Sequence, residues 1–346
     1  MRIFVRLITL LCGGLFLLAP QIAAGAAPTP PAPPTTGPGG SDYSFGDITA
    51  HRYGDGDSEY WIFEPTKPTP KSAPVIIFNH GWSAMSPDTY GAWIKHLVRR
   101  GNIVIFPRYQ ASMRTPMKDF TPNAVAAIKT AMKELQNNSH VQPELDHVAV
   151  VGHSMGGAIT PSMAALAAAE GLPIPKAICC VEPGNHVIDA PNINMPLADL
   201  SKISPDTLAL VIIGDRDKMV GDDTAKSIYA GIKQIPAANK DFITLISDEH
   251  GNPPLLGTHM APVAAEVIVP NDAANAKPFA QKMRERMEAN TVDAMDFYGT
   301  WKLLDGLTDA AFFGKNRQYA LGNTPQQRYM GQWSDGTPVK ELKIGP

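Results

Sequence analysis

The segment at residues 152–157, with the sequence GHSMGG, constrains the fold of this chain more than any other feature. It directly follows the apolar run at residues 147–151 and precedes an alanine-rich segment that favours a helix. Its glycines suit a sharp turn between a buried strand and a helix, because residues without a Cβ fit where the backbone is crowded. Such a turn lifts the hydroxyl of Ser154 above the end of a sheet. The segment therefore predicts a serine nucleophile at a strand-to-helix turn.

Short apolar runs alternate with helix-like segments, which indicates an α/β fold with a mostly parallel central sheet and helices on both faces. Strands are expected at residues 75–78, 103–106, 148–151, 177–181, 208–213 and 242–246, with an antiparallel strand at 60–63. Helices are expected near residues 90–98, 121–135 and 291–307, and an insertion at 262–290 is expected to be helical at 279–288. Pro161 should kink the helix after Ser154. Residues 183–205 are predicted to form a long connection.

The N-terminus predicts export. Residues 1–26 combine basic Arg2 and Arg6, an apolar stretch and a small-residue cleavage site, the pattern of a secretory signal peptide. Cys12 suggests a lipoprotein as the alternative, but Leu11 is bulky for the position before a lipidated cysteine. Residues 27–40 are expected to be a proline-rich disordered linker, and 41–346 a single domain with a C-terminal extension. The mature chain is thus expected to be secreted or periplasmic, without an integral membrane span.

Composition narrows the possible partners. The formal net charge is −3 and the mature part has no basic run, which argues against nucleic acid or an anionic membrane as a partner. Cys179 and Cys180 lie in an apolar run and are expected to be buried thiols of a core strand. No group of histidine, cysteine and acidic residues has metal-ligand spacing, so neither a metal nor a cofactor is expected.

A serine nucleophile needs main-chain donors for the oxyanion that forms during attack. One donor is expected from the residue after the serine, Met155, and the second from the loop after an early strand. The run at residues 75–78 ends in Asn79-His80-Gly81-Trp82, so the N–H of Trp82 is the expected second donor. His80 and His153 flank the site but belong to backbone motifs.

The serine also needs a base, and the base needs an acid that orients it. Asp217 is the expected acid because the spacing after the strand at 208–213 places it beyond the turn. Asp215 competes for this role or caps the turn, and Glu182 is a third candidate. His259 is the expected base, since it ends a loop rich in proline and glycine before an alanine-rich segment. His250 is the alternative because it lies closer to the preceding strand.

Together these motifs resemble the α/β-hydrolase superfamily. The Ser-Met-Gly-Gly turn and the His-x-x-Pro that begins at His259 are similar to those of secreted lipases, cutinases and dienelactone hydrolases. The resemblance implies a secreted serine hydrolase that cleaves a small-molecule or lipid-like ester through an acyl-enzyme. A peptidase, an acyltransferase or a non-catalytic binding protein on the same scaffold are the alternatives.

The chain also departs from these relatives. It lacks a cysteine pair suited to the disulfide of many cutinase-like polyester hydrolases, and it carries Pro161 in the helix after the serine. It also extends far beyond the usual final helix, to Pro346. These differences argue against activity on polyesters. Haloalkane dehalogenases and epoxide hydrolases use aspartate where this chain has Ser154, which argues against both.

Overall fold

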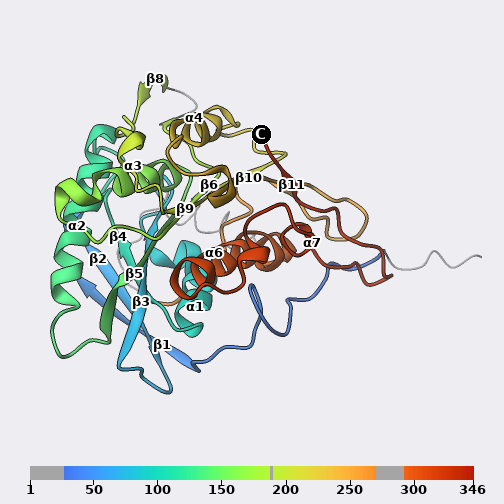
Figure 1. Cartoon of the computed structure of the whole chain (residues 1–346), viewed down its shortest axis with the longest axis horizontal. Coiled ribbons are helices and arrows are strands. Elements are labelled where there is room, and N and C mark those ends of the chain that lie inside the picture. The colour runs from blue at the N-terminus through green and yellow to red at the C-terminus, as the bar shows by residue number, and fades with distance from the viewer. Residues whose placement is uncertain (1–26, 188–189, 270–291) are drawn as a thin grey trace, which may run out of the picture.

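A sheet whose central strands are parallel organises the computed structural model, which describes residues 27–187, 190–269 and 292–346 (Figure 1). Within this part of the chain the nine strands have the order β1-β2-β4-β3-β5-β6-β9-β10-β11. Strands β4 to β10 of this order are parallel, and β1, β2 and β11 pair antiparallel. The strands are β1 (Asp47–Tyr53), β2 (Tyr60–Thr66), β3 (Ser72–Asn79), β4 (Ile103–Pro107), β5 (Gln142–His153), β6 (Ala177–Val181), β9 (Leu208–Gly214), β10 (Lys240–Leu245) and β11 (Lys343–Ile344).

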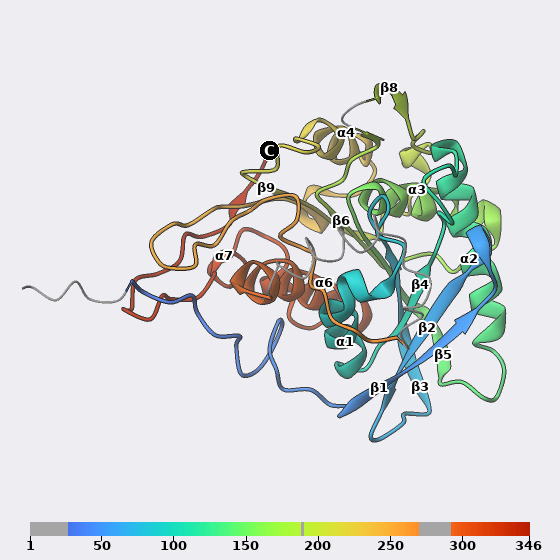
Figure 2. The same cartoon turned by 180° about the vertical axis from the view of Figure 1, so that it is seen from behind.

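Helices cover both faces of this sheet, which confirms the predicted α/β architecture (Figures 1 and 2). They are α1 (Gly91–Arg99), α2 (Phe120–Glu134), α3 (Met155–Glu170), α4 (Asp223–Gly231), α6 (Trp301–Phe313) and the short α7 (Pro325–Arg328). Alternate strand residues point to opposite faces. In β3, Val75 and Ile77 pack in the core with α2, α3 and α4, whereas Ile76 and Phe78 pack in the core with α1 and α6. No helix in the described ranges is long and apolar enough to cross a bilayer.

Each expected strand overlaps an observed strand, but several elements were not predicted. The short strands β1 and β11 extend the two edges of the sheet, and residues 183–205 carry a small hairpin of β7 (His186–Val187) and β8 (Ala190–Asn194). Helix α3 contains Pro161 and continues to Glu170. The last expected helix corresponds to the π-helical turn Met295–Thr300 followed by α6. The expected helical segment at 279–288 lies outside the described residues.

The N-terminal segment differs from its prediction as a disordered linker, because residues 27–40 pack against the rest of the molecule. The N–H of Thr29 donates to Ser334 Oγ at 2.9 Å, and its carbonyl accepts from the Ser334 N–H at 3.0 Å. Figures 1 and 2 show this segment beside the C-terminal residues. Proline-rich chains lose little backbone entropy when they become ordered, so a few contacts with an existing surface suffice.

The C-terminal extension is part of the same packed structure. The Trp333 side chain is fully buried, and its indole N–H donates to Asp248 Oδ2 at 3.1 Å. β11 pairs antiparallel with β10, and Val339 and Leu342 join the core that contains α1 and α6. The extension therefore covers the edge of the sheet that β10 would otherwise expose.

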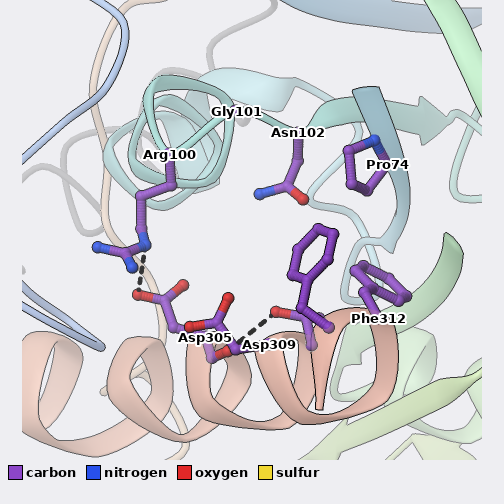
Figure 3. Close-up of a pocket in the computed structure, with 9 residues that line it drawn as sticks. Pro74, Arg100, Gly101, Asn102, Asp305, Asp309 and Phe312 are labelled. Atoms are coloured by element: carbon purple, nitrogen blue, oxygen red, sulfur yellow. Dashed lines mark hydrogen bonds and ion pairs between the residues drawn. The ribbon is translucent and has the colours of Figure 1, made fainter. Parts of the chain in front are cut away.

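A buried ionic cluster joins α1, α6 and the N-terminal segment. The Asp305 carboxylate lies 2.9 Å from His96 Nε2 and 3.1 Å from Arg100 Nε, and it accepts a hydrogen bond from the Gly39 N–H at 2.8 Å. Figure 3 shows Arg100 facing Asp305 across a small cavity. Burial raises the pKa of Asp305, but the charges of His96 and Arg100 outweigh it and leave the pKa below its ordinary value. This cavity is lined by Pro74 and lies at the amino end of β3, opposite the end that precedes Ser154 in β5.

We predict that Asp305→Asn lowers the free energy of unfolding by about 3 kcal/mol, because it leaves the buried partners of the carboxylate uncompensated. Because the pKa of Asp305 is lower in the folded state than in the unfolded state, its carboxylate stabilises the folded state above about pH 3.9. This stabilisation is lost as the pH falls. Urea unfolding at pH 7 and pH 3 should therefore show a smaller difference between wild type and variant at the lower pH. Asp309→Asn is the matched control, one turn away on α6, where burial raises the pKa instead. An equal loss in both variants would contradict the prediction.

Candidate active site

Ser154 occupies a strained turn between β5, which ends at His153, and α3, which begins at Met155. Its backbone has φ 57° and ψ −122°, a conformation that residues other than glycine rarely adopt. The turn depends on glycine: a Cβ on Gly156 would lie 2.0 Å from the carbonyl oxygen of Asn79, and one on Gly152 would lie 2.2 Å from that of Gly156. The turn therefore requires glycine at positions 152 and 156, because any larger residue there would clash with the backbone.

His259 and Asp217 lie in line with the serine, at the carboxyl edge of the sheet. His259 Nε2 is 2.9 Å from Ser154 Oγ, and His259 Nδ1 is 2.8 Å from Asp217 Oδ2. A carboxylate accepts, so Nδ1–H donates to Asp217 and leaves Nε2 free to accept the hydroxyl proton. The structure thus brings together the three residues that the sequence favoured for nucleophile, base and acid.

The environment of Asp217 keeps its carboxylate charged. Burial raises the pKa of Asp217, but the hydrogen bond with His259 and those from the N–H groups of Val220 and Met219 outweigh burial and lower it overall. The N–H of Met219 donates to Oδ1 at 2.8 Å and that of Val220 at 3.1 Å. An anion held in this position stabilises a histidine that gains a proton during reaction.

Two main-chain N–H groups, one next to Ser154 and one in the loop after β3, make no hydrogen bond within the described part of the chain and are the candidates for oxyanion donors. The N–H of Gly81 donates to the hydroxyl of Tyr90 at 2.9 Å, which leaves the next N–H, that of Trp82, without a partner among the described residues. The N–H of Met155 is at the first position of α3, where no intrahelical acceptor exists. The two N–H groups belong to Trp82 and Met155, the residues from which the sequence analysis expected the oxyanion donors.

Residues 76–226 match a family model described as an alpha/beta hydrolase fold, from within β3 to within α4. The protein has the α/β-hydrolase fold. The match includes Ser154 and Asp217 but stops before His259, so the position of the base rests on the contacts above. A comparison with curated proteins found no match to the chain.

The competing candidates for base and acid have other partners. His250 Nε2 lies 2.8 Å from Asp335 Oδ2, and its ring packs beside Trp333 in the C-terminal extension. Asp215 accepts hydrogen bonds from the N–H and the hydroxyl of Ser247. Asp215 therefore fixes the loop after β10, whereas the sequence analysis offered it as the acid or as a cap of its own turn after β9.

His153 and Tyr90 connect the loop after β3 to the candidate base, His259. His153 Nε2 donates to the carbonyl of His259 at 2.8 Å, which fixes the tautomer, and His153 Nδ1 accepts from the Tyr90 hydroxyl at 2.9 Å. Burial lowers the pKa of His153 to about 3, so the ring stays neutral. The same hydroxyl accepts from Gly81. The sequence analysis placed Tyr90 only at the start of the helix expected near residues 90–98, and no local signal indicates its polar contacts.

His80 has a separate structural role in the same loop. Its ring stacks on Tyr109 at 4.0 Å between centroids and on Phe106 at 5.2 Å. Burial lowers the pKa of His80 to about 3, and its Nδ1 lies 2.6 Å from the carbonyl of Gly81. His80 therefore shapes the loop that carries Trp82 rather than taking part in proton transfer.

Glu182 places a second carboxyl group against the candidate base. Its side chain is fully buried, and Oε2 lies 3.4 Å from His259 Nδ1. Burial and the charge of Asp217 raise the pKa of Glu182 well above its ordinary value. No described residue donates a hydrogen bond to either of its oxygens. The two pKa shifts are opposite in direction, so a single negative charge is favoured on Asp217 over Glu182.

We predict that Asp217→Asn lowers kcat by about 10⁴-fold, because an amide neither stabilises the imidazolium nor holds the correct tautomer. Glu182→Gln, which mimics a neutral acid, should retain activity within about tenfold. Steady-state kinetics on an activated ester compares the two variants. If Glu182→Gln proved the more damaging change, Glu182 rather than Asp217 would be the orienting acid.

Proposed function

We propose that this protein is a secreted carboxylic-ester hydrolase that works through an acyl-enzyme on Ser154. The observation that carries the proposal is the continuous contact from Ser154 Oγ through His259 to Asp217, with distances of 2.9 and 2.8 Å. The match to the α/β-hydrolase family supports it. Secretion rests on the sequence pattern of residues 1–26.

In the proposed reaction, His259 Nε2 takes the hydroxyl proton as Ser154 Oγ attacks the ester carbonyl carbon. The N–H groups of Trp82 and Met155 stabilise the resulting oxyanion. The ester C–O bond then breaks, the alcohol leaves with the proton from His259, and the acyl group remains on Ser154. Water activated by the same histidine releases the carboxylic acid and restores the hydroxyl.

The strained backbone of Ser154 suits this role. Ser154 is only 9% exposed, and its hydroxyl contacts His259 Nε2. The N–H of Ser154 donates to the carbonyl of Val181 at 3.0 Å, which ties the turn to the end of β6. A fixed nucleophile loses little entropy on attack, which is one source of enzymatic acceleration.

The experiment that tests the proposal is a panel of p-nitrophenyl esters graded by acyl length, with matched peptide anilides. We expect ester hydrolysis with an initial burst of p-nitrophenol, the sign of an accumulating acyl-enzyme. An optimum at short chains would indicate an esterase, and a rise with long interfacial substrates a lipase. Turnover of anilides without esters would indicate a peptidase and contradict the proposal.

A further inference from the structure

Three side chains able to bind a metal lie together far from Ser154. They are His51 of β1, Glu64 of β2 and His140 in the connection between α2 and β5. His140 precedes the first residue of β5, whereas Ser154 follows the last. Residues 49 and 64 are partners in the β1–β2 ladder, so His51 lies diagonally across from Glu64 on the same face.

The distances among the donor atoms fit one small cation. Glu64 Oε2 lies 3.3 Å from His51 Nε2 and 2.8 Å from His140 Nδ1, and all three donors lie within 4.8 Å of one another. Tetrahedral Zn²⁺ with bonds of about 2.0–2.1 Å places its ligand atoms about 3.3 Å apart. An ion can therefore replace the shared proton between Glu64 and His140 with small side-chain shifts.

The surroundings of these donors also resemble those of metal ligands. The second oxygen of Glu64 accepts the N–H of Val141 at 2.6 Å. His140 Nε2 lies 2.9 Å from the Tyr53 hydroxyl and 3.6 Å from a carboxylate oxygen of Glu134. A ligating histidine ordinarily gives its other ring N–H to such an oxygen, which fixes the ring and strengthens the ligand.

The burial of two of these side chains and the exposure of the third also suit a metal site. The side chains of Glu64 and His140 are 5% and 2% exposed, whereas that of His51 is 37% exposed. A buried carboxylate is costly unless a nearby charge compensates it, and a divalent cation supplies that charge. The exposed side at His51 leaves an entry path and room for water as a fourth ligand.

We propose that His51, Glu64 and His140 form a zinc site that fixes the connection between α2 and β5 to the β1–β2 edge of the sheet. Two imidazoles and one carboxylate suit Zn²⁺ better than Ca²⁺, which prefers six or more oxygen ligands. The sequence analysis expected no metal because these ligands come from separate elements and form no local motif.

The test is a titration of the full mature chain, freed of metal with EDTA, with ZnCl₂ in competition with a chromophoric chelator. We expect one equivalent to bind with a Kd in the micromolar range or below, and His51→Ala to weaken binding at least tenfold. At 100-fold excess over the wild-type Kd, Zn²⁺ should raise the Tm of the wild type by about 5 °C and that of His51→Ala by at most about half as much. Co²⁺ in the same site should give the visible absorption of a four- or five-coordinate ion.

The matched control is His250→Ala, which removes a histidine that is 38% exposed and pairs with one carboxylate, Asp335. This variant should bind Zn²⁺ like the wild type. Three results would overturn the proposal: no stoichiometric binding, equal binding by His51→Ala, or Zn²⁺ that inhibits ester hydrolysis in proportion to occupancy. The last would place the ion at His153, Glu182 and His259, which also lie together. Because binding is measured without turnover, failure of the zinc site leaves the proposed hydrolase function untouched.

Discussion

Ser154→Ala should lower kcat for a short p-nitrophenyl ester by about 10⁵- to 10⁶-fold, leaving only the acceleration from substrate binding and the oxyanion donors. The reason is geometric: the hydroxyl that contacts His259 Nε2 at 2.9 Å is the group we propose to bond to the acyl carbon. Alanine cannot form that bond. Initial rates with p-nitrophenyl butyrate, together with a circular dichroism spectrum that shows the native fold, measure the effect.

The control for this variant is Ser162→Ala, which removes another buried serine from α3. The Ser162 hydroxyl donates to the carbonyl of Ala158 at 3.2 Å and accepts from the N–H of Ala198 at 3.2 Å. Its loss should lower stability by about 1 kcal/mol and change kcat by less than a few-fold. Retention of wild-type turnover by Ser154→Ala would show that the nucleophile lies elsewhere.

His259→Ala should lower kcat by a similar factor, about 10⁵- to 10⁶-fold, whereas His250→Ala should keep kcat within about threefold of wild type. His259 contacts both Ser154 and Asp217, so its removal takes away the proton acceptor and the proton donor of the reaction. His250 instead pairs with Asp335 near the molecular surface. Parallel kinetics of the two variants on one ester gives the comparison.

A pH series sharpens the comparison of the two histidines. Wild-type kcat should rise with pH as the base becomes neutral, and His250→Ala should show the same profile. The residual activity of His259→Ala should instead rise in proportion to hydroxide, because no side chain remains to accept the proton. A His250→Ala variant that lost the wild-type profile would assign the base to His250.

The parts of the fold that could be predicted from sequence depend on local patterns. Strands of a sheet that is buried on both faces need nearly continuous apolar residues. Short apolar runs in the sequence therefore predicted six of the observed strands, β3, β4, β5, β6, β9 and β10. The turn at Ser154 could be predicted because it needs glycines that are visible in the sequence. A Cβ added at Gly156 or Gly152 would lie 2.0 or 2.2 Å from a backbone oxygen. Chain order then limited the acid and the base to a few loops.

What could not be predicted depends on contacts between distant segments. Gly39 hydrogen-bonds Asp305, and Thr29 pairs with Ser334, so the order of residues 27–40 arises from partners near the other end of the chain. The link from Tyr90 to His153 and the approach of His140 to Glu64 are of the same kind. Composition and periodicity describe one segment at a time and hold no information on such pairs.

The most direct test of the central claim is covalent labelling with a fluorophosphonate, which reacts with an activated serine and forms a stable adduct. Intact mass and peptide mapping of the wild type should show one adduct, on Ser154. His259→Ala should label far more slowly, and Ser154→Ala should not label at all. An adduct on another residue, or none on the folded wild type under conditions that label a known serine esterase, would contradict the account.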